Sequence, residues 1–317
     1  MGSVKDVMVI KDPTEKEFGV GVFDFRDDYS VFDYGHKGPM PNTIPFKGEC
    51  LCRMATWNFE QLEKIGIKTH FLKFIEPNKM GVNIVRVLYP GKDEITTETT
   101  NYLIPLEIVF RNSLPAGSSV FRALDSGELT LEDIGLDHKP EPGEKLEEPI
   151  LDITTKLEAT DRRVKWDEAK KMSGLSDEDV EKIKEFTFKI NDFLTEKAKE
   201  LGLDHADGKI EVGFGPNREL VLLDVCGTLD ENRFLLNGFH ISKQVLRDYY
   251  MKTPWFSALE EAKKSKPKEE WPDPEKLPEE LVTGVSNMYK AAYEAWSGNK
   301  IWNVSLEDSV NTVRKFL

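Results

Sequence analysis

The alternation of apolar and polar residues in the first third of the chain predicts antiparallel strands. Short runs of β-branched and aromatic residues are separated by turn residues, and the clearest runs cover 4–10, 19–25 and 83–88. A further strand begins near residue 101 and continues to 110. Successive strands joined by turns are typical of a twisted antiparallel sheet.

Apolar residues at helical spacing predict amphipathic helices over residues 49–65, 174–200 and 279–296. The helix at 174–200 has the clearest start, because Ser176 and Asp179 have the spacing of a capping box. The apolar stripe of the last helix is more typical of a core face than of a ligand platform. These helices are therefore expected to pack and to do no chemistry.

Three segments complete the pattern. Residues 124–148 are rich in Gly, Pro, Asp and Glu and are interpreted as a linker or a surface excursion. A short helix is expected near 241–250, and the Lys- and Pro-rich segment 262–278 is expected to be exposed. No internal repeat is found, which excludes solenoids and propellers.

A hairpin supplies the clearest candidate chemistry. Residues 209–213 and the apolar run 220–224 read as adjacent strands, and they bring Glu211 and Asp224 to one end of the hairpin. Two hard oxygen ligands side by side suit Mg²⁺, which binds one or two carboxylates together with substrate phosphates. An amphipathic hairpin with solvated acids would show the same pattern, so the hairpin alone leaves both interpretations open.

Length and composition agree with a soluble enzyme that has a sizeable core, and cytoplasm is the default location. The chain has 317 residues, of which 39% are hydrophobic, and no apolar run approaches the ~20 residues of a membrane-spanning helix. A net charge of −14 argues against nucleic acid as a partner, although a local cluster of Lys and Arg can still bind a small phosphorylated ligand. The three cysteines are interpreted as reduced and buried.

Seven segments resemble, in order and spacing, phosphoribosylaminoimidazole-succinocarboxamide synthase (SAICAR synthetase), a ligase of purine biosynthesis. The segments are GSVKDV (2–7), RDDYSVFD (26–33), IPFKGE (44–49), PLEIVFRN (105–112), AGSS (116–119), TKLE (155–158) and SKQVLRDY (242–249). The resemblance covers roughly residues 2–297.

The resemblance implies an α+β fold with an ATP cleft between two domains. Residues 1–110 would form an N-terminal antiparallel sheet domain with the ATP lid and adenine slot, and residues 111–317 a larger α+β domain with the substrate and metal site. The implied reaction joins L-aspartate to the carboxylate of carboxyaminoimidazole ribonucleotide (CAIR), with ATP and Mg²⁺ as cofactors. The partners are then small molecules, with no nucleic acid or membrane, and the chain works as a monomer or a homodimer.

The resemblance also assigns residues to roles. Gly2, Lys5 and Glu107 are expected to contact ATP, and Glu211 and Asp224 to hold the metal. Lys47, Lys156 and Asp161 are expected to be catalytic. The imidazole nucleotide is expected to contact Arg111, Ser118, Arg233, Lys243 and Arg247. Without the resemblance, a surface salt bridge or a solvated helix face would explain these cations equally well.

Three positions depart from the family pattern. Ser3 stands where the family has a lysine, Thr160 where it has a histidine, and Val225 where it has a glutamate. These departures leave two alternatives open: a paralogue that uses ATP on another carboxylate or amine, and a nucleotide-binding regulator without turnover. His70 is interpreted as a structural histidine at a strand end.

Overall fold

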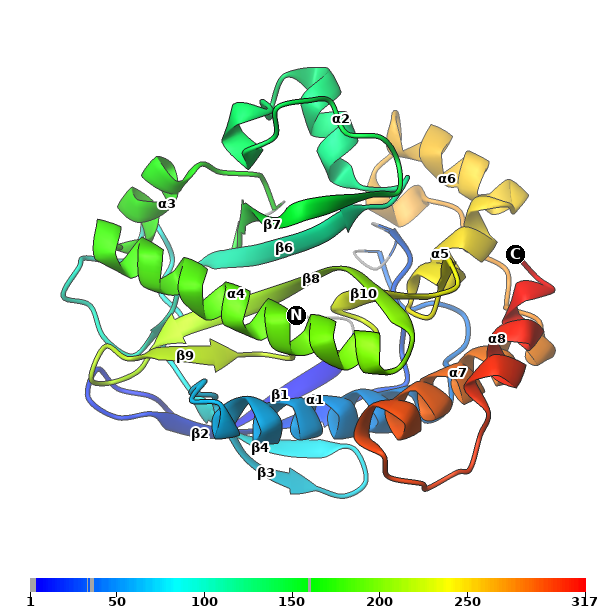
Figure 1. The fold of residues 1–317 in the computed structure, drawn as a ribbon, viewed down its shortest axis with the longest axis horizontal. Helices are drawn as coiled ribbons and strands as arrows, with labels where there is room; N and C mark the ends of the chain where they lie inside the picture. Colours follow the sequence, from blue (N-terminus) through cyan, green and yellow to red (C-terminus); the bar gives the residue numbers. More distant parts are fainter. Residues whose placement is uncertain (1–3, 33, 35–36, 159–160) are drawn as a thin grey trace.

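Two antiparallel sheets form the frame of the protein (Figure 1). The computed structural model describes residues 4–32, 34, 37–158 and 161–317. The first sheet has the order β1-β2-β4-β3, with bounds Lys5–Lys11, Gly19–Phe25, Lys79–Ile84 and Phe71–Ile75. The larger sheet has the order β11-β10-β8-β6-β7, with bounds Phe239–His240, Asn232–Leu236, Leu203–Phe214, Leu106–Leu114 and Glu144–Thr155. Two short strands, β5 (Tyr102–Leu103) and β9 (Leu220–Leu223), also pair with β8.

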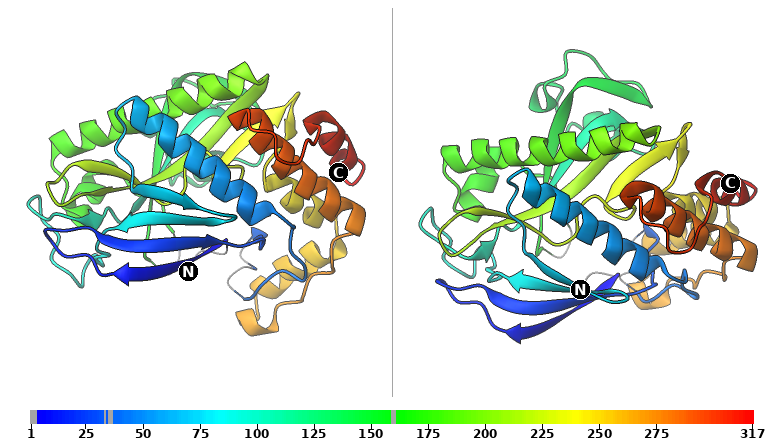
Figure 2. Two further views of the ribbon diagram at one scale, coloured as in Figure 1. Left: turned by 90° about the horizontal axis from the view of Figure 1, so that it is seen from below. Right: turned by 60° about the horizontal axis from the view of Figure 1, so that its bottom comes forward.

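Helices cover these sheets from outside. The helix α4 (Asp177–Glu200) crosses the larger sheet, and α1 (Lys47–Lys64) lies against the smaller sheet and beside α7 (Glu279–Ser297) (Figures 1 and 2). The remaining helices are α2 (Ser119–Ser126), α3 (Trp166–Ser173), α5 (Gln244–Met251), α6 (Pro254–Lys263) and α8 (Leu306–Arg314). Short 3₁₀ turns lie at Glu132–Ile134 and Lys268–Glu270. The fold is therefore α+β, as expected.

Most predicted elements are present, with shifted ends. The strand at 19–25 and the capping box of Ser176 and Asp179 are confirmed. The strand predicted at 83–88 instead ends at Ile84, because the chain turns away from the sheet toward β5. Residues 124–148 contain the end of α2, a 3₁₀ turn and the start of β7, so they are more structured than a linker.

The segment 262–278 is less exposed than its charges suggest. It includes the end of α6, and Trp271 and Leu277 are buried in the main hydrophobic cluster. Apolar residues spaced irregularly among lysines and prolines show no period, so the sequence pattern did not reveal this packing. The helices α2, α3, α6 and α8 have no counterpart among the predicted elements.

One hydrophobic cluster runs through both sheets. It joins Phe23 and Phe25 of β2 to Ile108 of β6 and Ile210 of β8. Residue 110 lies inside β6, so the chain passes from the smaller sheet to the larger one earlier, between Ile84 and Tyr102. The proposed division into two domains at residue 110 remains a prediction.

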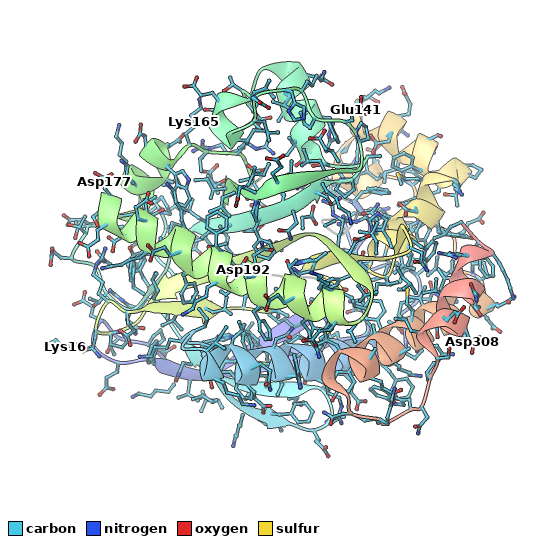
Figure 3. The ribbon with its side chains drawn as sticks, in the orientation of Figure 1. Lys16, Glu141, Lys165, Asp177, Asp192 and Asp308 are labelled. Carbon is cyan, nitrogen blue, oxygen red and sulfur yellow. The ribbon has the colours of Figure 1, made fainter. Side chains whose placement is uncertain are left out.

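The surface carries the acidic excess. Exposed acids lie on α4 (Asp177 and Asp192), on α8 (Asp308) and in the loop before β7 (Glu141) (Figure 3). In the described part of the chain, no helix is both long and apolar enough to cross a membrane. The cysteines Cys50, Cys52 and Cys226 are free and buried, as expected.

Candidate active site

One face of the larger sheet is charged at alternate positions. Paired residues in an antiparallel sheet share a face, and Arg111 pairs with Asp207 while Val109 pairs with Lys209. The intervening residues Ile108, Phe110 and Ile210 belong to the hydrophobic core. The sheet therefore keeps one face for packing and offers the other to ligands.

A β-bulge in β8 sets which side chains reach this face. Arg233 pairs with Asp207 and Phe234 with His205, so Ala206 is the extra residue. The bulge interrupts the alternation, so that the His205 ring bonds Thr195 of α4 while Asp207 faces the opposite side. Bulges commonly redirect a side chain next to a site.

Glu211 and Asp224 lie close enough to influence each other's ionisation. Glu211 pairs with Leu223 across the hairpin, and Asp224 follows directly. Burial and the charge of Asp224 raise the pKa of Glu211 to about 8. Burial also opposes ionisation of Asp224, but the neighbouring Lys5 outweighs it and holds the pKa of Asp224 below its usual value.

Lysines neutralise this acid pair. Lys5 forms an ion pair with Asp224, and Lys156 Nζ lies 2.5 Å from Glu211 Oε1. Glu107 joins this cluster, because its Oε1 lies 3.4 Å from Lys156 Nζ and 2.9 Å from Lys209 Nζ. The cluster brings Lys5, Glu107, Lys156, Glu211 and Asp224 together, from sequence positions more than 200 residues apart.

The donor set fits a hard cation that is completed by substrate. No group of three or more His, Cys, Asp or Glu side chains in the described ranges could hold a metal by itself. The carboxylates of Glu211 and Asp224 supply hard oxygens, and Mg²⁺ typically takes only one or two such ligands besides water and phosphate oxygens. The residues present therefore fit Mg²⁺ bound together with a nucleotide.

A pocket of about 210 Å³ lies along the same face of β8. Its lining includes Asp207, Lys209, Asp230 and Glu231 and all but one of the residues expected to bind the imidazole nucleotide, namely Arg111, Arg233, Lys243 and Arg247. The exception, Ser118, is the N-cap of α2, where its hydroxyl accepts from the Val120 amide.

Two cations of this pocket lack a partner. Within the described residues, neither the Lys243 ammonium nor the Arg247 guanidinium makes a hydrogen bond or ion pair, and Arg247 Nε is buried. Burial lowers the pKa of Lys243, and burial together with nearby Arg233 lowers that of Arg247. Half-buried cations without counterions indicate a site for an anion.

The other cations of the pocket are already paired. Arg111 lies 2.9 Å from Asp152 and 3.3 Å from Asp207, and Arg233 lies 2.8 Å from Asp207. Arg111 Nε is buried without a hydrogen-bond partner. Its guanidinium is therefore held in place by two carboxylates, and its Nε–H group remains available to donate to a ligand.

Lys47 is placed differently from the expectation. Its side chain is 0% exposed, and its Nζ donates to Asp230 at 2.7 Å and to the Asp28 carbonyl oxygen at 3.1 Å. Tyr289 donates to the second oxygen of Asp230 at 2.6 Å. Lys47 thus does not line the pocket in this conformation and reaches it only through Asp230.

A further residue that was predicted to be catalytic lies outside the pocket. Asp161 is exposed in the loop before α3 and is not part of the pocket lining. Gly2 lies outside the described residues, as do Ser3 and Thr160. Val225 is buried in the main hydrophobic cluster directly after Asp224.

A small apolar cluster lies beside the acid pair. Val221 and Leu223 share a face of the hairpin with Glu211, and Val85 and Leu103 pack against them. On the smaller sheet, Val7 pairs with the buried Phe23 and therefore points to the same side as Lys5, although it is 53% exposed. Apolar surface thus lines the approach to the acids from both sheets.

Sequence reasoning missed three members of the site. Asp207 and Lys209 precede Glu211 at intervals of two on β8, so the alternation that selected Glu211 would also have selected them. His70 Nε2 lies 3.0 Å from the Asp224 carbonyl oxygen, a contact without a sequence signal because 154 residues separate the partners.

Named relatives resemble the chain over its full length. A protein of Archaeoglobus fulgidus, provisionally assigned as a phosphoribosylaminoimidazole-succinocarboxamide synthase, is 42% identical over 100% of both chains. The phosphoribosylaminoimidazole-succinocarboxamide synthase of Thermoplasma acidophilum is 36% identical over 94% of this chain and 98% of its own.

Solved structures share the fold. A SAICAR synthetase in complex with ADP matches with a TM-score of 0.66 and 23% identity, over 95% of this chain and 98% of its own. The SAICAR synthase of Saccharomyces cerevisiae, complexed with SAICAR, matches with a TM-score of 0.69 and 22% identity, over 96% and 95%. The family model of SAICAR synthetase matches residues 1–262. The chain therefore belongs to the SAICAR synthetase family.

Proposed function

We propose that the protein is an ATP-dependent carbon–nitrogen ligase that joins L-aspartate to the carboxylate of CAIR. The products are SAICAR, ADP and phosphate, and the step belongs to de novo purine biosynthesis. Family membership supports this proposal, and so does the arrangement of charges along β8.

The observation that carries the proposal is the alignment of three charged residues on one strand face. Asp207 and Lys209 line the cationic pocket, and Glu211 belongs to the acid pair. Four residues of strand span about 13 Å, so the anion pocket and the acid pair are neighbours along β8. A phosphorylated substrate in the pocket can thus present its other end to a nucleotide at the acids.

We place the ribose 5′-phosphate of CAIR at the unpaired cations. Lys243 and Arg247 have no counterion within the described residues, and a phosphate dianion would supply one. Arg233 is fixed by Asp207 and adds a planar donor. Arg111 is oriented by Asp152 and Asp207 and is assigned to the imidazole or its carboxylate.

We place ATP between the two sheets. The adenine ring would pack between Val7 and Val9 of β1 and the apolar cluster of Val85, Leu103 and Leu223. The triphosphate would then extend toward Lys5. When phosphates arrive, Lys5 and Lys156 can exchange their carboxylate partners for phosphate oxygens, which frees Glu211 and Asp224.

The freed carboxylates would hold Mg²⁺, which neutralises charge on the triphosphate when it is bound. The low pKa of Asp224 keeps this carboxylate ionised at neutral pH. Glu211 is the weaker acid, because it is buried and repelled by Asp224. Holding two repelling acids together is a cost that a divalent cation relieves.

The chemistry explains why such a site is needed. A carboxylate resists nucleophiles because it is charged and has no leaving group. Transfer of the γ-phosphoryl group from ATP to a carboxylate oxygen of CAIR gives an acyl phosphate and ADP. The amine of aspartate then attacks the carbonyl carbon, the bond to the phosphate oxygen breaks, and the nitrogen loses a proton. The protein holds the reacting groups in place and shields them from water.

Substrate omission tests the proposal. Purified protein with Mg²⁺-ATP should release ADP only when CAIR and L-aspartate are both present, as measured by a coupled ADP assay. ADP release with another carboxylate and amine pair would indicate the paralogue. This alternative is raised by Val225, which is buried where the family has a glutamate. ATP binding without turnover under any pairing would identify a regulator and refute the ligase.

The setting of the reaction is part of the same proposal. We expect the enzyme to act in the cytoplasm as a monomer or a homodimer. Sedimentation velocity across a range of protein concentrations distinguishes these two states.

A further inference from the structure

The backbone of Asp224 adopts a conformation that must be held in place. Its φ is 61°, in the left-handed region that residues other than glycine adopt at a cost. Asp224 directly follows the last residue of β9, so its own strand no longer fixes it. The side chain can meet Glu211 only if this backbone geometry persists.

His70 contacts this backbone directly. Its Nε2 lies 3.0 Å from the Asp224 carbonyl oxygen. A carbonyl oxygen only accepts hydrogen bonds, so Nε2 carries the proton and donates. The bond fixes the peptide plane that follows Asp224, and with it the direction in which the carboxylate leaves the chain.

The main chain of His70 is itself anchored to both sheets. Its amide donates to the Leu222 carbonyl oxygen of β9 at 3.0 Å, and its carbonyl oxygen accepts from the Asn83 amide of β4 at 2.7 Å. The ring is 2% exposed and packs against Phe23 and Phe59, with ring centroids 5.4 and 5.5 Å away. His70 can therefore hold Asp224 from a rigid support.

We propose that His70 is a positioning residue for the metal site, which acts by holding the left-handed backbone of Asp224 so that its carboxylate stays beside Glu211. The inference rests on the proposed binding of Mg²⁺ with nucleotide and extends it. It adds a role to His70, which was predicted to be a structural histidine at a strand end and directly precedes β3.

Metal-dependent nucleotide binding tests the proposal without turnover. The affinity for ADP is measured by calorimetry with and without Mg²⁺, and the ratio of the two dissociation constants reports the contribution of the metal. His70→Phe keeps the ring packing but removes the donor, so this ratio should fall about 10-fold. His70→Gln can place an amide proton at the position of Nε2 and should keep most of the ratio.

Two further variants separate positioning from folding. Phe59→Leu loosens the packing around the His70 ring but leaves its donor, so it should lower the melting temperature and keep the metal ratio. His70→Asn is polar and carries its amide too close to the backbone to reach Asp224, so it should reproduce the loss even if His70→Phe fails to fold.

The change in the metal ratio across the four variants distinguishes positioning from a general effect on folding. A reduced ratio in His70→Phe and His70→Asn, with the ratio kept in His70→Gln and Phe59→Leu, supports positioning. An unchanged ratio in His70→Asn, or an equal loss in Phe59→Leu, overturns it. If Mg²⁺ does not strengthen ADP binding to the unaltered protein, the proposed metal site fails first and this inference fails with it.

Discussion

At the scale of single residues, the site combines carboxylates that repel each other with cations that lack partners. Burial and the charge of Asp224 raise the pKa of Glu211, and Lys243 is half-buried without a counterion in the described part of the chain. Such groups lower stability unless a ligand completes them. Two predictions follow from these energetic costs.

The first prediction concerns the acid pair. Glu211→Gln and Asp224→Asn keep the shape but remove the charge, so kcat in the coupled ADP assay should fall by at least about 100-fold. Glu219→Gln is the control, because Glu219 lies on the same hairpin but pairs with the exposed Lys68 at 2.6 Å. Full activity in both acid variants would remove them from the mechanism.

The second prediction is a trade between stability and binding. The pKa of Lys243 lies below its unfolded value of 10.5, so the unfolded chain holds the proton more tightly and the charge destabilises the fold at neutral pH. Lys243→Met should therefore gain about 1 kcal/mol at pH 7 in urea unfolding and bind CAIR more weakly. This gain should shrink as the pH rises from the lowered pKa toward 10.5.

The control for Lys243 is an exposed lysine. Lys264 is the C-cap of α6, and its exposed side chain pairs with Glu261 of the same helix at 2.9 Å. Lys264→Met should leave the free energy of unfolding close to that of the parent, because an exposed ion pair contributes little to stability. A Lys243→Met protein less stable than the parent at pH 7 would contradict the account of Lys243 as an unpaired, partly desolvated cation.

At the scale of elements, successive side chains of β1 point to opposite faces, and this alternation allows a test of where the nucleotide binds. Val9 pairs with Gly21 and points to the side of Lys5, whereas Met8 pairs with Val22 on the opposite face. Val9→Ser should weaken ADP binding about 3- to 10-fold, because it removes apolar area that adenine would cover. Met8→Ser, at a more exposed position, should leave the ADP dissociation constant unchanged in calorimetry. Equal effects of the two substitutions on the ADP dissociation constant would show that the adenine does not bind against this face of β1.

A buried ion pair links α1, α7 and the loop before β10. Lys47 and Tyr289 both contact Asp230, which lines the substrate pocket. Lys47→Met leaves the buried carboxylate with only one partner side chain, so urea unfolding should show a loss of about 3 kcal/mol or more. Adding Asp230→Asn should recover part of this loss, because the unpaired charge is then gone. If the double variant loses more free energy of unfolding than the two single variants lose together, this explanation is contradicted.

At the scale of the whole molecule, a nucleotide between the sheets should tie them together. Lys5 comes from the smaller sheet and Asp224 from the end of β9, next to the larger sheet. Mg²⁺ with ADP at 100 times the dissociation constant should add about 2.7 kcal/mol to stability. Hydrogen exchange should show protection in β1 and in β9 alike, and adenosine should protect less than ADP. Protection confined to one sheet would place the nucleotide elsewhere.

Local pattern determined much of the architecture. The strand at 19–25, the helix around 49–65, the capped helix α4 and the stripe of α7 could all be predicted, because their periodicity reflects one buried face. The acid pair could be predicted for the same reason, since a hairpin is a local structure and its two ends meet whatever the rest of the chain does.

Long-range contacts decided the rest. That Lys47 would be buried against Asp230, 183 residues further along, has no local signal. The same is true of Ser118 as a helix cap, of the lysines that neutralise Glu211, and of His70 behind Asp224. The sequence by itself determined the elements and the kinds of charge available. Only the tertiary structure decided which charges meet, because electrostatic interactions depend on distance and burial, and those are set when distant segments pack.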